Sequence, residues 1–377
     1  MVLKSHKRLF TIAIVVWLVT FLVVALLVYK DPTKRSVVPV YYNAVSNWLM
    51  QQDLYGNALS FHYLPQFVYV YMPFYHLGVP IGDILWRGLS LFIFVWGIFV
   101  FIKDNFHHRW GEYLLVATLL IVTPSIGALR NGQANLVFSA LCVWAMVFLI
   151  RHQWWRCSLC LGLLVAVKQT GLILSLLAIA AYPTLIWRFA LILLGLLVIP
   201  FLSADPAYAL SQYKGALREM SGLATTKKSF ADINGLLRAM GLHLEGLYSV
   251  VVRVVAGMLT LSLWLYARIT LQQPLLAITF LGLATAYLMV FHPMTEQNSY
   301  VIVAPAISLT AIYLLQKGTD RWAAVVLIVI CICLDVLPEV LRRWYPHLGL
   351  WFKPLCALIY LGLLTRFTLR KATQRVL

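Results

Sequence analysis

Long apolar runs recur along this sequence, and they constrain its fold more than any other feature. A run of about 17–25 apolar residues can cross the hydrocarbon core of a bilayer as a helix. Two further apolar stretches are irregular, because residues 63–79 contain two prolines and residues 157–183 are interrupted by a lysine. The pattern predicts an all-α integral membrane protein with about 10–13 membrane helices. The regular runs are residues 9–29, 84–102, 112–129, 134–150, 187–202, 247–267, 275–291, 299–315, 322–338 and 350–365.

The composition supports a membrane protein. Hydrophobic residues make up 62% of the chain and charged residues 11%, whereas a soluble domain is about 25% charged. The formal net charge of +17 suggests nucleic acid as a partner, but the basic residues stand in short clusters between apolar runs, as topology signals do. We therefore expect the lipid bilayer as a partner and no nucleic acid. No long polar linker divides the chain, which predicts a single transmembrane domain over residues 1–377.

The basic clusters also predict the orientation of the chain. Lys and Arg accumulate in cytoplasmic loops, so the basic start and the basic tail are expected in the cytoplasm. Residues 30–62 and 203–246 are then external. Three polar clusters that interrupt apolar sequence, residues 130–135, 168–170 and 292–298, are predicted to share this external face. Polar groups at membrane depth are costly and usually line a functional cavity.

The first two clusters contain candidate anion-binding residues. Arg130 has a permanently charged planar fork that suits phosphate, and Asn131, Gln133 and Asn135 supply neutral donors and acceptors. Lys168 interrupts an apolar run, so it must be paired, hydrated or bound to an anion. The alternatives are an ordinary turn with an interfacial arginine, and a lysine that extends to the membrane surface.

The third cluster contains a lone carboxylate, Glu296, with His292, Gln297 and Asn298 beside it. A general base needs a carboxylate or imidazole close to the proton of the acceptor. Capping of the following helix by Asn298 explains part of this cluster. It does not explain His292 and Glu296 together.

The first external segment combines two carboxylates, Asp31 and Asp53, with many aromatic residues. Aromatic rings beside amides and carboxylates form sugar-binding surfaces, so Tyr41, Tyr42 and Tyr63 are candidate sugar contacts. An aromatic belt at the membrane interface is the alternative. The sequence contains no Asp-x-Asp, which leaves a metal-bound pyrophosphate donor unsupported. We expect neither a metal ion nor a cofactor.

The order of these short motifs resembles glycosyltransferase family 87. From about residue 31 to residue 310 the chain reads YYNA, DLYG, YLPQ, MPF, RNGQANL, GLLVAVKQT and TEQNSY. The family comprises integral membrane enzymes of the GT-C fold, typified by polyprenol-phosphate-mannose-dependent mannosyltransferases of bacterial envelopes. The resemblance implies that Gln133, Asn135 and Lys168 line a cavity for a lipid phosphate.

One departure from the family concerns the catalytic base. The first loop of the family usually begins with an aspartate that is taken as the base, and residues 36–42 have valine where it should fall. The resemblance is therefore to a divergent branch. If the enzyme is active, its base must come from elsewhere, and the candidates are Glu296, Asp53 and Asp31.

The sequence therefore predicts a lipid-phosphate-dependent hexosyltransferase in a bacterial inner membrane. It would move a sugar from a polyprenyl-phosphate donor to an envelope glycolipid or glycan at the periplasmic face. Two alternatives stay open: a non-catalytic carrier or flippase of lipid-linked sugars, and an inactive relative that only binds them.

Overall fold

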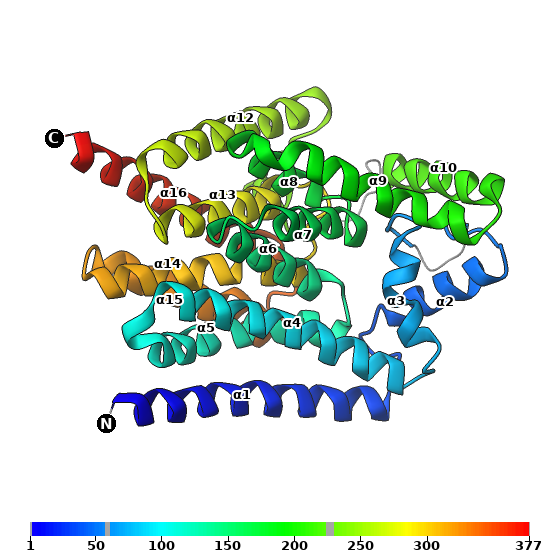
Figure 1. The fold of residues 1–377 in the computed structure, drawn as a ribbon, viewed down its shortest axis with the longest axis horizontal. Helices are drawn as coiled ribbons and strands as arrows, with labels where there is room; N and C mark the ends of the chain where they lie inside the picture. The colour runs from blue at the N-terminus through cyan, green and yellow to red at the C-terminus, as the bar shows by residue number, and fades with distance from the viewer. Residues whose placement is uncertain (1, 57–60, 224–229, 377) are drawn as a thin grey trace.

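The structure is a computed structural model that describes residues 2–56, 61–223 and 230–376 (Figure 1). Over these residues it is all-helical, without a β-strand, and eight of their helices are long and apolar enough to cross a membrane. These are α1 (Val2–Lys30), α4 (Ile81–Asn105), α5 (Trp110–Asn131, after η1, His107–Arg109), α9 (Ile186–Ser203, after η2, Pro183–Leu185), α12 (Gly246–Thr270), α14 (Ala304–Lys317, after η3, Gln297–Ile302), α15 (Arg321–Val340) and α16 (Leu348–Val376). The predicted polytopic helical bundle is confirmed.

Four shorter apolar helices complete the bundle: α6 (Asn135–Ile150), α7 (Trp154–Val167), α8 (Gly171–Ala181) and α13 (Leu275–Phe291). Almost every residue of α13 is buried, and so is most of the span that ends with α14. By contrast, α1, α9 and α12 leave most of their apolar side chains exposed, as expected for helices that face lipid. The short helices can fall below membrane length because protein, rather than lipid, surrounds them.

The first external segment folds into short helices at one end of the bundle. Helices α2 (Val38–Leu49) and α3 (Phe67–Tyr75) lie there together with α10 (Pro206–Leu223), whereas both chain termini lie at the opposite end (Figure 1). The rings of Trp48 and Tyr208 are 5.1 Å apart, and the Leu54 amide donates to Gln212. The described parts of residues 30–62 and 203–246 therefore meet on one face. Residues 57–60 and 224–229 of these segments lie outside the described residues.

The interrupted stretch 157–183 forms a helical hairpin, α7 followed by α8. The two ends of the hairpin come together, with the rings of Trp154 and Tyr182 5.9 Å apart. Ser175 Oγ donates to the carbonyls of Gly171 and Leu161. With 14 and 11 residues the helices are about 21 and 17 Å long, short of the ~30 Å hydrocarbon core. The tip of the hairpin, residues 168–170, therefore ends among protein side chains.

Candidate functional site

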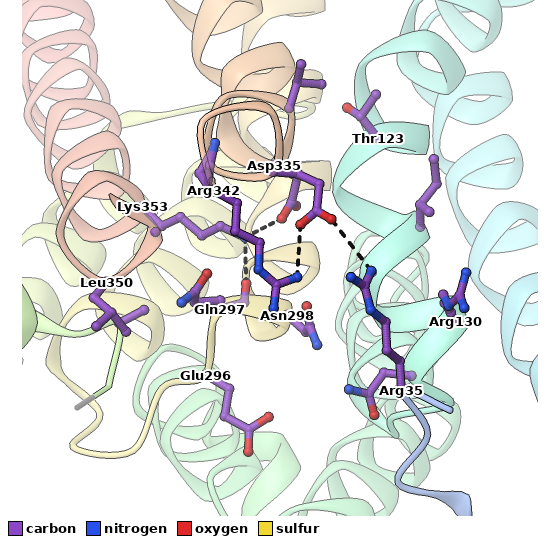
Figure 2. Close-up of a pocket in the computed structure, with 18 of the residues that line it drawn as sticks. Arg35, Thr123, Arg130, Glu296, Gln297, Asn298, Asp335, Arg342, Leu350 and Lys353 are labelled. Atoms are coloured by element: carbon purple, nitrogen blue, oxygen red, sulfur yellow. Dashed lines mark hydrogen bonds and ion pairs between the residues drawn. The ribbon is translucent and has the colours of Figure 1, made fainter. Parts of the chain in front are cut away.

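A cavity of about 970 Å³ lies where the ends of α5 and α15, the start of α16 and residues 296–298 meet (Figure 2). Two of the three predicted polar clusters contribute to its wall. Its wall holds both basic and acidic side chains, and apolar residues of α5, α15 and other segments complete it. The polar residues that line it are Arg35, Thr123, Arg130, Asn131, Glu296, Gln297, Asn298, Asp335, Glu339, Arg342 and Lys353.

Gly132 determines how α5 ends beside this cavity. Its φ is 68°, in the left-handed region that costs other residues about 1–2 kcal/mol. A Cβ here would lie 2.5 Å from Val38 Cγ2 and 2.8 Å from Arg87 Nη2, so a side chain has no room. The chain reverses at this glycine, and Gln133 and Asn135 are buried immediately after it.

Four predicted residues form a continuous chain of hydrogen bonds. Lys168 Nζ donates to Asn135 Oδ1 at 3.3 Å, and Asn135 Nδ2 donates to Gln133 Oε1 at 2.8 Å. Gln133 Nε2 then donates to Glu296 Oε2 at 2.5 Å. The hairpin tip, the start of α6 and the segment before η3 thus meet at one point. This series of hydrogen bonds reaches the cavity at Glu296. Lys168 stands at the other end of the series and does not line the cavity.

Arg130 and Lys168 share one electrostatic property. Among the described residues, no carboxylate forms an ion pair with either of them. The Nε atom of Arg130 is also buried without a hydrogen-bond partner. An unpaired cation at a polar cavity favours an anionic ligand.

Of the three candidate tyrosines, Tyr41 contacts the 130–135 segment directly and Tyr63 is linked to it through Tyr41. The Tyr41 hydroxyl accepts a hydrogen bond from the Ala134 amide at 3.2 Å and lies 2.8 Å from the Tyr63 hydroxyl. Tyr42 instead packs against Tyr75, with ring centroids 4.4 Å apart. Tyr41 and Tyr63 therefore support the site, and Tyr42 lies apart from it.

The two first-loop carboxylates lie in exposed turns and do not line the cavity. Asp31 Oδ1 accepts hydrogen bonds from the Thr33 hydroxyl and from the Lys34 amide. The Thr33 bond lowers the pKa of Asp31, which weakens it as a base. Asp53 Oδ1 accepts from the Tyr55 amide at 3.1 Å. Of the three candidate bases, only Glu296 reaches the cavity.

The remaining residues of the third cluster differ in whether they line the cavity. Gln297 and Asn298 line the cavity, but His292 does not. His292 Nδ1 accepts a hydrogen bond from the Met294 amide at 3.3 Å, which closes the turn after α13. Asn131 lines the cavity, and its carbonyl accepts the Val37 amide at 2.9 Å.

Sequence reasoning missed a lysine that holds the Glu296 segment in place. Lys353 is buried at the start of α16, forms an ion pair with Asp335 and donates to the Gln297 carbonyl at 2.9 Å (Figure 2). Asp335 and Lys353 each stand inside an apolar run. Ionisable residues at such positions are usually paired and functional, and that signal could have found them.

A second missed pair holds the Arg130 segment. Asp83 and Arg87 form an ion pair one turn apart in α4, and both side chains are about 1% exposed. The Arg87 guanidinium also donates to the carbonyls of Leu129 and Arg130, each at 2.9 Å. Both carbonyls belong to the last turn of α5; the Leu129 carbonyl also accepts from the Gly132 amide at 3.2 Å, and Arg87 supplies the donor to the Arg130 carbonyl. The spacing Asp-x-x-x-Arg at the start of an apolar helix was the available signal.

The fold and the cavity define a multi-pass membrane protein with a carboxylate-bearing polar site at one end of its helical bundle. The sequence profile of glycosyltransferase family 87 matches residues 61–293, well over half of the chain. The chain belongs to this family and is therefore a membrane glycosyltransferase. No curated protein matches it. The matched region contains Arg130, Gln133 and Lys168, whereas Glu296 and the first-loop carboxylates fall outside it.

Proposed function

We propose that the protein transfers one hexose from a polyprenyl-phosphate donor to an envelope glycolipid or glycan at the periplasmic face of a bacterial inner membrane. One observation carries this proposal. Glu296 lines a polar cavity whose wall also holds the unpaired guanidinium of Arg130, and Gln133 orients the Glu296 carboxylate. A base and an anion-binding group thus face the same space, as transfer from a phosphate-linked sugar requires.

In the proposed reaction Glu296 acts as the general base. An oxygen of its carboxylate takes the proton of the acceptor hydroxyl while the acceptor oxygen forms a bond to the anomeric carbon of the donor. The bond between that carbon and the phosphate oxygen breaks, and polyprenyl phosphate leaves with the electron pair. The anomeric configuration is inverted. Glu296 then returns its proton to water.

Arg130 would bind the donor phosphate. Its planar fork can donate two hydrogen bonds to phosphate oxygens, and these charge-assisted bonds strengthen as negative charge develops on the leaving group. Lys168 acts as a positioning residue in this scheme, because its ammonium holds Asn135, which in turn holds Gln133 and Glu296.

Transfer of radiolabelled sugar from defined polyprenyl-phosphate donors, with the purified protein in lipid, tests the proposal. We expect Glu296→Gln to reduce turnover by at least the ~10²-fold typical of a lost general base while donor binding persists. Asp53→Asn is the matched control, because Asp53 is an exposed carboxylate that does not line the cavity.

Normal transfer by Glu296→Gln together with loss in Asp53→Asn would put the base in the first loop. Wild-type protein that binds the donor and moves it across the bilayer without any transfer would favour the carrier instead.

A further inference from the structure

Three arginines from separate parts of the chain converge on the mouth of the cavity. Arg35 comes from the turn before α2, Arg130 from the last turn of α5 and Arg342 from the turn after α15. Their labelled side chains lie around the same open space (Figure 2). Three positive charges at one opening repel each other unless an anion lies between them.

Glu339 supplies part of that negative charge. Its carboxylate lies 3.6 Å from Arg35 Nη1 and 3.7 Å from Arg342 Nη1. All three side chains are more than half exposed, at 55% for Arg35, 64% for Glu339 and 59% for Arg342. Exposed ion pairs of this kind are weak. A stronger anion can therefore replace Glu339 at little cost.

Among the described residues Arg130 has no such counter-ion, and a backbone hydrogen bond holds the segment of Arg35 beside it. The Val37 amide donates to the Asn131 carbonyl at 2.9 Å, which ties the Arg35 segment to the end of α5. Arg35 itself has a φ of 55°, a left-handed conformation that residues other than glycine rarely adopt. Such a conformation persists only where the surrounding structure imposes it.

The rest of the opening indicates a lipid ligand. Val336 and Val340 of α15 line the cavity, and their side chains are 39% and 61% exposed. An apolar chain on this face of α15 would place a phosphate at its end beside the arginines. A phosphate group accepts two parallel hydrogen bonds from each guanidinium that it faces, and these are stronger than an exposed carboxylate contact.

We propose that Glu339 occupies the place of a lipid phosphate in the cavity, and that the phosphate displaces it from Arg35 and Arg342 and binds them together with Arg130. The inference rests on the proposed function and extends its donor site by two residues. Because the Glu339 contacts must break when the ligand binds, Glu339 opposes binding. An uncharged lipid gains nothing from the displacement, so Glu339 makes the opening selective for an anion.

Binding of a short isoprenyl monophosphate to the purified full-length protein in phosphatidylcholine nanodiscs tests this. We expect Glu339→Gln to bind it about three- to tenfold more tightly than the wild type, the effect of removing two exposed ion pairs. In an Arg35→Gln/Arg342→Gln background binding is weaker, and adding Glu339→Gln changes nothing further. The isoprenyl alcohol of the same length shows no difference between variants.

Glu112→Gln is the matched control. It also removes a carboxylate from an exposed arginine pair, with Arg109, but it lies at the other end of α5, about 27 Å from Arg130. It should bind the phosphate like the wild type. If the wild type binds the isoprenyl phosphate and Glu339→Gln binds it equally or more weakly, this inference is overturned while the proposed function stands. If Glu339→Gln binds inorganic phosphate more tightly than the wild type but not the isoprenyl phosphate, the lipid assignment is overturned. If neither the wild type nor any variant binds the isoprenyl phosphate, the proposed donor is rejected as well.

Discussion

Replacing Arg87 with methionine should destabilise the protein strongly, because it breaks a buried ion pair. Arg87 and Asp83 are both about 1% exposed, so the change leaves the Asp83 carboxylate charged and buried without its partner. Removing one member of a buried ion pair costs about 3–5 kcal/mol. The Arg130 carbonyl also loses its donor, at about 1–3 kcal/mol for a buried group left unsatisfied, whereas the Leu129 carbonyl keeps the Gly132 amide.

These contributions are not additive, so we expect Arg87→Met to lower the free energy of unfolding by about 4 kcal/mol or more. Equilibrium unfolding by sodium dodecyl sulfate in mixed micelles, followed by tryptophan fluorescence, measures this loss. Arg151→Met is the matched control. Its ion pair with Asp104 is more than one-third exposed on both sides, so the loss should stay within about 1 kcal/mol.

The double variant Asp83→Asn/Arg87→Met separates charge from hydrogen bonding. It removes the isolated carboxylate and leaves only the lost hydrogen bonds to the two carbonyls, so it should be more stable than Arg87→Met by at least about 1.5 kcal/mol. A loss below about 1 kcal/mol in Arg87→Met would refute the reasoning, since no buried charge can then depend on Arg87. A double variant no more stable than the single one would show that the carbonyl contacts alone matter.

Two further predictions concern donor binding and orientation. Arg130→Ala should weaken binding of a polyprenyl-phosphate sugar about ten- to a hundredfold, the effect of one charge-assisted contact. Lys168→Ala should weaken it only about two- to tenfold, because Lys168 acts through Asn135. Titration calorimetry of both variants checks this order, and an equal loss of affinity would place Lys168 on the phosphate itself. In a cysteine-free background, an impermeant thiol reagent added from the periplasmic side should label Gln52→Cys and Lys214→Cys but not His108→Cys or Arg156→Cys, and the reverse pattern would invert the predicted orientation.

The glycosyltransferase family and the helical architecture could be predicted from the sequence because both depend on local patterns. An apolar run of membrane length is a helix wherever it lies in the bundle, since every backbone polar group must be satisfied within it. Lys168 interrupts such a run and Gly132 ends another, and both do so in the structure. The motif order indicated the family without any knowledge of how the helices pack.

The choice among carboxylates depended on the tertiary structure. Asp31, Asp53 and Glu296 all stand in polar segments between apolar runs; the neighbours of Glu296 in sequence favoured it as the base, but sequence could not show which of the three reaches a cavity. The structure separates them, because only Glu296 meets the cavity and receives the Gln133 amide from a position 163 residues away. Contacts at that separation depend on the rotation and packing of whole helices.

The packing of whole helices also explains why the sequence revealed neither the different positions of Arg130 and Lys168 nor the buried ion pairs. Sequence alone identified Arg130 and Lys168 as unusual charges near the membrane, but it could not show that three side chains link Lys168 to the cavity that Arg130 lines. Nor could it show that Lys353 pairs with Asp335. Apolar length and residue type are properties of the chain and determined its class. The partner of each buried charge is set by which helix faces come together, and only the folded bundle decides that.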